Sequence, residues 1–135
     1  MSVEYLDLAA FIAIAAAVTA LDENTIAKVA DLGLADSALH APSAQFGDRE
    51  FYEAFIDKAA VLVVRLARNH PLPDGNKRVA WVALRMFIDM NGWSWSRRPD
   101  IHEAEEIVLA IAAGHLDEQR TAEWLRDYLV APESS

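Results

Sequence analysis

Residues 70–78 read His-Pro-Leu-Pro-Asp-Gly-Asn-Lys-Arg and place several chemically useful side chains close together. His70 supplies a base that can be neutral near pH 7. Asp74 supplies a hard oxygen ligand of the kind that Mg²⁺ uses when it is bound together with phosphates. Gly75 lets a ligand approach the backbone closely. We interpret a base, a metal ligand and a phosphate-binding turn within one short segment as the parts of a phosphoryl-transfer site.

The next two charged residues, Lys77 and Arg78, fall in the first turn of a predicted helix. The helix macrodipole disfavours a cation there by roughly 0.3–1 kcal/mol, and the backbone N–H groups of a first turn lack helical partners. A bound anion would pair with those N–H groups and offset both charges, as phosphates do at helix N-termini. Taken singly, each residue of the segment is more simply explained as a turn or surface residue, but together they favour a site for an anion.

The segment resembles the signature of the Fic/Doc family, His-x-Phe-x-Asp/Glu-Gly/Ala-Asn-Gly/Lys-Arg, in order and spacing. The one difference is Leu72, which stands where the signature has Phe and, being apolar, is expected to anchor the loop in the core. Residues 37–47, 58–60 and 86–92 are also similar to the Doc (death-on-curing) toxin subfamily. The resemblance therefore covers roughly residues 30–130, and it implies the Fic/Doc helical fold.

Two positions within this resemblance bear on the reaction. AMP-transferring Fic enzymes usually have Gly at the position of Lys77 and carry a second Arg at the position of Trp81, so Lys77 and the lack of a second Arg are Doc traits. Doc proteins resemble Fic enzymes in fold but bind ATP in the reverse orientation and transfer its γ-phosphoryl group. The resemblance thus implies a protein Ser/Thr kinase that uses ATP and Mg²⁺.

The resemblance also assigns a role to each residue of the signature. His70 takes the proton from a target Ser or Thr hydroxyl, Asp74 is catalytic and holds Mg²⁺, and Arg78 is catalytic. The phosphates of ATP are held by Gly75, Asn76, Lys77 and Arg78. A target-docking flap, along which an extended target segment pairs like a strand, is assigned to Ser43, Ala44, Gln45, Phe46 and Gly47. A plain connecting loop is an equally good interpretation of that segment.

These assignments imply a cytoplasmic toxin that phosphorylates a translation factor, for which elongation factor Tu is the family precedent, and so arrests growth. A cognate antitoxin would be its second partner. Two alternatives stay open: AMP transfer to a protein hydroxyl, which Trp81 disfavours, and a catalytically inactive antitoxin-binding module, which the intact signature disfavours. Thr19, Glu23 and Asn24 fit the Ser/Thr-x-x-x-Glu-Gly/Asn motif of self-inhibited Fic proteins, but three loosely specified positions arise easily by chance.

The elements that position this segment are predicted to be helices almost throughout. Apolar residues at helical spacing predict helices over residues 8–19, 25–30, 76–90 and 99–113, and a last helix from Asp117 with Tyr128 and Leu129 facing inward. The helix that leads into the motif is predicted to begin at an Asp48 N-cap, with Phe51 facing inward, and to end near Asn69.

The whole pattern predicts one compact all-α domain over residues 1–131, followed by a disordered tail at 132–135. Residues 93–96 alternate between apolar and polar and indicate a short extended piece, so we allow for at most one short β-hairpin. The four tryptophans are expected to pack in the core or at its rim.

Composition and charge limit the classes of function. The net charge of −9 disfavours direct nucleic-acid binding, because phosphate contacts need a basic surface. Only residues 49–96 are basic, with seven basic and five acidic side chains, which suits a local site for a small anion. Residues 8–18 are apolar but too short to span a bilayer, so we predict a buried helix and no membrane association. The chain has no cysteine, which excludes a thiol nucleophile.

Overall fold

A computed structural model describes residues 2–133, which contain seven α-helices, one 3₁₀ turn and four two-residue strands. In chain order they are α1 (Leu8–Thr19), α2 (Glu23–Val29), α3 (Leu32–His40), η1 (Ala41–Ser43), β1 (Gln45–Phe46), β2 (Arg49–Glu50), α4 (Phe55–Asn69), α5 (Asn76–Met90), β3 (Ser94–Trp95), α6 (Ile101–Ala112), α7 (Glu118–Arg126) and β4 (Leu129–Val130). The predicted all-α class is confirmed.

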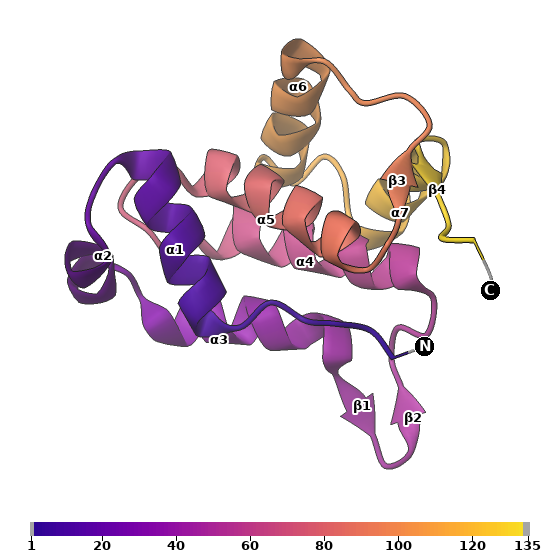
Figure 1. Cartoon of the computed structure of the whole chain (residues 1–135), viewed down its shortest axis with the longest axis horizontal. Coiled ribbons are helices and arrows are strands. Elements are labelled where there is room, and N and C mark those ends of the chain that lie inside the picture. Colours follow the sequence, from indigo (N-terminus) through magenta and orange to yellow (C-terminus); the bar gives the residue numbers. More distant parts are fainter. Residues whose placement is uncertain (1, 134–135) are drawn as a thin grey trace.

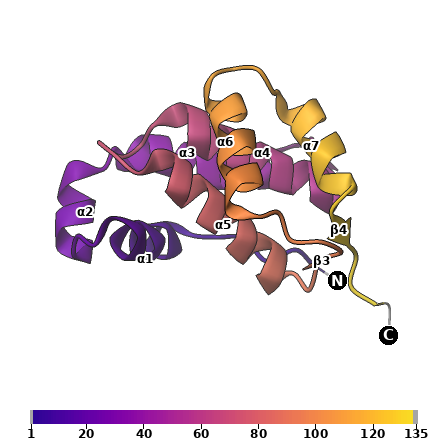
Figure 2. The same ribbon diagram turned by 90° about the horizontal axis from the view of Figure 1, so that it is seen from above.

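Helix α4 forms the centre of the domain. It is buried along nearly its whole length, and it packs against α3, α5, α6 and α7. The helices α4 and α5 run antiparallel through the middle of the molecule, with α3 on one side of the pair and α6 on the other (Figure 1). The loop that joins α4 to α5 therefore lies at the end of the domain where α1 meets α2 (Figures 1 and 2).

Most helices begin with the same device. Five of them have an aspartate N-cap whose carboxylate accepts a backbone N–H of the first turn, and these caps are Asp7, Asp22, Asp31, Asp100 and Asp117. Such a cap typically contributes about 1 kcal/mol. Helix α5 lacks a side-chain cap and begins after Gly75 instead, so its first-turn N–H groups are left open for another partner.

The helix that leads into the motif begins later than predicted. Asp48 does not cap α4, which starts at Phe55 after Ala54. Gly47 and Asp48 instead form the two-residue loop of an antiparallel hairpin between β1 and β2, and Gly47 takes a φ of 61° that favours glycine in such loops. Phe51, which was expected to face inward, is 64% exposed.

A second strand pair closes the C-terminal part of the domain. Strand β3 pairs antiparallel with β4, so that Trp95 lies opposite Leu129, and the predicted extended piece at 93–96 is confirmed. Helix α7 ends at Arg126, so Leu129 reaches the core from a strand and not from the predicted helix. The fold therefore has two small strand pairs where at most one hairpin was expected. Of the predicted disordered tail, residues 134–135 lie outside the described part of the chain.

Helix α1 packs on the domain through Phe11, Ile14 and Ala15, as expected for a buried apolar helix. Within residues 2–133, no single helix has both the length and the apolar character needed to cross a membrane. Helices α1 and α2 reach that length and composition together, but they meet at a bend of 105°.

Candidate functional site

The motif borders a cleft with a volume of about 590 Å³ between α5, α6 and the end of α1. The cleft is lined by the predicted residues Asp74, Gly75, Asn76, Lys77 and Arg78, together with Val18, Trp81, Val82, Ile101, Ala104, Glu105, Val108 and Leu109. The structure thus brings the predicted metal ligand and the predicted phosphate-binding residues to one side of a single cleft. His70 lies on the same loop but not in the lining of the cleft.

His70 ends α4 in a left-handed conformation. Its φ of 50° and ψ of 56° lie in a region that residues other than glycine seldom occupy. Holding a residue with a Cβ there costs roughly 1–3 kcal/mol, and Pro71 after it prevents the helix from continuing. The imidazole is exposed to solvent. Strain at an exposed histidine is typical of a functional position.

The loop is anchored through Leu72 and Asn76. Leu72 is only 5% exposed and belongs to the core, which confirms that it anchors the loop. The Asn76 side-chain oxygen accepts the Leu72 N–H at 2.9 Å, and its amide group donates to the Leu72 carbonyl at 2.7 Å. The Asn76 side chain is therefore engaged within the loop, and its backbone N–H is the group that remains for an anion.

Gly75 is required at its position for two reasons. Its φ of 83° is left-handed, and a Cβ there would lie 3.2 Å from Thr19 Cγ2 at the end of α1. The end of α1 thus lies against the loop. Glu23 begins a separate helix, with left-handed Ala20 between it and Thr19. The three positions of the inhibitory motif therefore do not share one helix face.

Lys77 and Arg78 are exposed cations without acidic partners. Within the described chain, neither of them forms an ion pair, whereas Lys58, Arg65, Arg97 and Arg126 each lie within 3.5 Å of a carboxylate oxygen. Two unpaired cations therefore stand beside the open N–H groups of the α5 first turn. This arrangement attracts an anion such as a phosphate.

Asp74 lies at the rim of the cleft, exposed to solvent. Among residues 2–133 there is no cluster of three or more His, Asp or Glu side chains that could hold a metal by themselves. A single carboxylate suits Mg²⁺, which protein sites usually bind through one or two carboxylates together with phosphate oxygens and water. Asp74 therefore fits a metal that arrives with a phosphorylated ligand.

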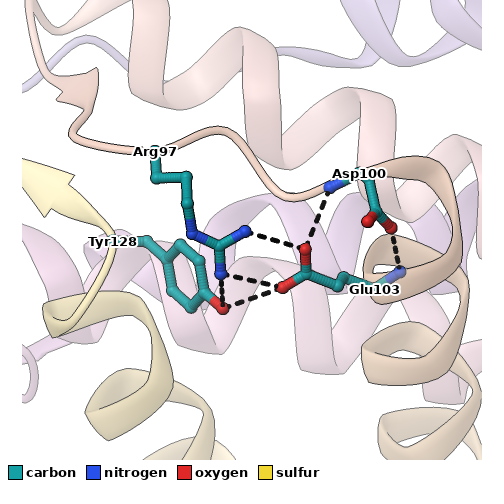
Figure 3. Close-up of polar contacts among 4 residues, drawn as sticks. All are labelled: Arg97, Asp100, Glu103 and Tyr128. Atoms are coloured by element: carbon teal, nitrogen blue, oxygen red, sulfur yellow. Dashed lines mark hydrogen bonds and ion pairs between the residues drawn. The ribbon is translucent and has the colours of Figure 1, made fainter.

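The opposite wall of the cleft is one face of α6, from Ile101 to Leu109, which the motif did not predict. Arg97 and Glu103 form a bidentate ion pair with N···O distances of 2.9 and 3.0 Å, and Tyr128 donates its hydroxyl to Glu103 at 3.0 Å (Figure 3). Asp100 and Glu103 also form a reciprocal capping box. Hydrogen bonds from Arg97, Tyr128 and the Asp100 N–H lower the pKa of Glu103 from 4.5 to about 2.

This network fixes the helix turn that carries Ile101, Ala104 and Glu105 to the cleft. The only sequence signal for that wall is the spacing of Ile101, Ala104 and Val108 on one helix face. The same spacing would suit a core-facing helix equally well.

Aromatic residues connect the two walls. The Trp81 ring lies 5.8 Å from Trp95 and 6.4 Å from Trp124, and Trp124 lies 4.5 Å from Tyr128. All four tryptophans are half-buried, as expected for the rim of the core. Trp81 therefore forms part of the cleft and of its support. His40, His102 and His115 are exposed.

The predicted flap, Ser43–Gly47, does not line the cleft. It enters the β1–β2 hairpin at the N-terminal end of α4, whereas the motif follows the C-terminal end (Figure 1). The 15 residues of α4 place roughly 22 Å between those ends. Lys58, only 1% exposed, holds the base of the hairpin by donating to Glu50 at 3.0 Å and to the Pro42 carbonyl at 3.1 Å.

Comparison with known proteins relates this architecture to one family. The sequence model of the Fic/DOC family matches residues 5–88. The chain is also 37% identical over 107 residues to Toxin Doc of Mycolicibacterium smegmatis (strain ATCC 700084 / mc(2)155), a match that covers 79% of this chain and 82% of that protein. The family match includes the motif and most of α5, whereas the α6 wall of the cleft lies beyond it.

Proposed function

Because this chain belongs to the Fic/DOC family, within its Doc subfamily, we propose that it is a toxin of a toxin–antitoxin pair that transfers the γ-phosphoryl group of ATP to a protein. Family membership implies a transferase that acts on proteins. The acceptor in our proposal is a Ser or Thr hydroxyl of a translation factor, with elongation factor Tu as the family precedent. A cognate antitoxin is the second partner, and the cytoplasm is the compartment.

The observation that supports this function best is the first turn of α5. Five helices close their first turns with an aspartate, whereas α4 and α5 have no side-chain cap, and of these two it is α5 that begins within the motif, at Gly75. Lys77 and Arg78 stand at that turn without acidic partners in the described chain. Open donors and unpaired cations beside a cleft are what the phosphates of a nucleotide require.

The proposed reaction is an in-line displacement at phosphorus. The target hydroxyl oxygen bonds to the γ-phosphorus, the bond from that phosphorus to the β–γ bridging oxygen breaks, and ADP leaves. His70 accepts the hydroxyl proton as general base. Arg78 and the N–H groups of the α5 turn stabilise the charge on the phosphoryl oxygens. Mg²⁺, held by Asp74 and the phosphates, neutralises phosphate charge when it is bound.

Trp81 supports γ-phosphoryl transfer over AMP transfer. The group placed in line with the target hydroxyl is the one transferred, so the orientation of ATP decides the product. Trp81 lines the cleft and offers neither the charge nor the forked donors of the second Arg that AMP-transferring Fic enzymes carry there. Lys77 adds a cation at the start of α5 that favours a terminal phosphate.

The hairpin suggests how a protein target docks. We propose that residues 43–47 contact the target away from the cleft, since Phe46 is 81% exposed and Lys58 holds the hairpin base. Only a macromolecule can reach both this hairpin and the motif at the opposite end of α4. That separation suits a protein substrate.

Labelled ATP tests the reaction directly. Purified protein and a cell lysate are incubated with ATP labelled at the γ- or at the α-phosphate, and labelled proteins are identified by mass spectrometry. Relative to lysate without the added protein, we expect one additional labelled protein from γ-labelled ATP only, and no additional label with His70→Ala. His115→Ala, which changes an exposed histidine away from the motif, is the matched control. Label from α-labelled ATP would contradict the kinase assignment, and no label from either would contradict the enzyme.

A further inference from the structure

Three glutamates at the beginning of α6 have different surroundings. Glu103 is engaged by Arg97 and Tyr128 (Figure 3). Glu106 lies on another side of the helix, beside Trp124 and Ala110. Glu105 lines the cleft, and within residues 2–133 its carboxylate has no ion pair. Of the three, only Glu105 is both unpartnered and directed at the cleft.

Glu105 is also the one charged residue of an otherwise apolar wall. The other α6 residues at the cleft are Ile101, Ala104, Val108 and Leu109, and Trp81 and Val82 lie on the α5 side. Ile101 is 70% exposed and Leu109 is 52% exposed, so the apolar part of this wall is open to a ligand. The cleft thus has a cationic end at the motif and an apolar part that contains one carboxylate.

A carboxylate at this position opposes phosphate binding through its charge, so it needs a different role in a cleft that accepts an anion. An ionised carboxylate only accepts hydrogen bonds. The part of the ligand that lies against α6 must therefore present O–H or N–H groups, next to an apolar surface. A nucleoside has both properties, because its base is flat and its sugar carries hydroxyls.

We propose that Glu105 is a specificity-determining residue that accepts hydrogen bonds from the nucleoside part of the nucleotide. This inference rests on the proposed function, since it places the phosphates at Lys77 and Arg78. The donors are the ribose hydroxyls or the amino group of the base. The Arg97–Glu103–Tyr128 network holds α6 in place before the ligand arrives, so little ordering of this wall is required on binding.

Binding titrations test the role of Glu105 with matched ligands. ATP and inorganic triphosphate are titrated into the wild-type protein, Glu105→Ala and Glu105→Gln, with Glu106→Ala as the control on the same helix. We expect Glu105→Ala to weaken ATP binding about 10-fold to 100-fold, as for a hydrogen bond to a charged group. Triphosphate binding should stay unchanged or tighten, because the variant removes a negative charge. The ATP affinity of Glu105→Gln, which keeps one acceptor oxygen, should lie between those of the wild type and Glu105→Ala.

Nucleotide analogues identify the donor. The loss caused by Glu105→Ala is measured again with 2′-deoxy-ATP, 3′-deoxy-ATP and inosine triphosphate. It should shrink with a deoxy analogue if the ribose hydroxyls contact Glu105, and with the inosine nucleotide if the base amino group does. A loss of the same size with all three analogues would overturn the proposal.

Three further outcomes count against it. Equal effects of Glu105→Ala on ATP and triphosphate would show that Glu105 does not contact the nucleoside. An effect that appears with Mg²⁺ and disappears with EDTA would make Glu105 a metal ligand. If the wild type and Glu105→Ala both bind ATP tightly, this inference is refuted and the proposed function stands. A wild-type protein that binds no nucleotide would instead refute both.

Discussion

The two walls of the cleft use their charged side chains differently. On the α5 wall, Lys77 and Arg78 have no acidic partner in the described chain, and the first-turn N–H groups are uncapped. On the α6 wall, Arg97, Glu103 and Tyr128 satisfy one another, and Asp100 completes a capping box. The charged and polar groups of the α5 wall are therefore available to a ligand, whereas those of the α6 wall pair with one another and hold the helix in place.

This contrast separates activity from stability. Changes on the motif side should reduce binding or turnover while the fold keeps its stability, because the affected groups have few partners within the protein. Changes in the α6 network should reduce stability first and affect the ligand only through the position of the helix. The following predictions test this separation of activity from stability.

His70→Ala should have the largest effect on activity. General-base catalysis typically accounts for about 10²–10⁴-fold in rate, and the His70 side chain is exposed to solvent. We expect turnover to fall by that factor while the thermal midpoint does not decrease. Transfer assays and thermal unfolding of the same preparation measure both. Wild-type turnover in the variant would exclude His70 as the base.

Arg78→Ala should weaken ATP binding about 10-fold to 100-fold, the range for a lost hydrogen bond to a charged group. Its stability should stay level or rise by up to about 1 kcal/mol, because a cation leaves a helix N-terminus. Arg120→Ala is a close control, since Arg120 is likewise exposed at the third position of α7. Calorimetric titration measures both affinities. An equal loss of ATP affinity in Arg78→Ala and Arg120→Ala would contradict a specific role for Arg78.

Asn76→Ala should reduce both the stability of the protein and its binding of phosphate. It removes two hydrogen bonds to Leu72, each of which contributes about 0.5–1.5 kcal/mol. We expect a loss of roughly 1–3 kcal/mol in the free energy of unfolding, together with weaker phosphate binding from a loosened loop. Urea unfolding measures the first effect. Unchanged stability with lost binding would instead make the Asn76 side chain a phosphate ligand.

Glu103→Gln should have the smallest effect, and it should depend on pH. The pKa of Glu103 is lowered from 4.5 to about 2, chiefly by Arg97. The stabilisation is therefore complete above pH 4.5 and is lost as the pH falls towards about 2. The difference in thermal midpoint between wild type and variant should narrow over that interval. A difference independent of pH would show that Glu103 acts through packing alone.

The sequence was most informative where local chemistry determines structure. The bounds of α5 were predicted correctly, because Gly75 before it and Asn91-Gly92 after it are strong local signals. Leu72 was placed in the core for its apolar character, and the structure confirms its burial. These features depend on residues that are close together in the chain.

Prediction failed where distant segments meet. Phe51 and Phe55 are spaced like residues on one helix face, so the Gly47-Asp48 loop was overlooked and α4 was started too early. The α6 wall depends on contacts between α6, Trp81 and Tyr128, which helical spacing does not reveal. The double hydrogen bond of Asn76 to Leu72 likewise depends on the loop geometry and not on residue type.

The left-handed backbone of His70 lowers the stability of the protein, whereas a requirement for activity keeps a histidine at that position. Glycine would occupy that conformation without the cost of roughly 1–3 kcal/mol that a Cβ brings, so a change to glycine at residue 70 would make the protein more stable. Only a requirement for the imidazole opposes that change. A lineage in which the activity was no longer needed would therefore drift towards glycine here early. The identity of this one residue would then report whether selection still acts on turnover.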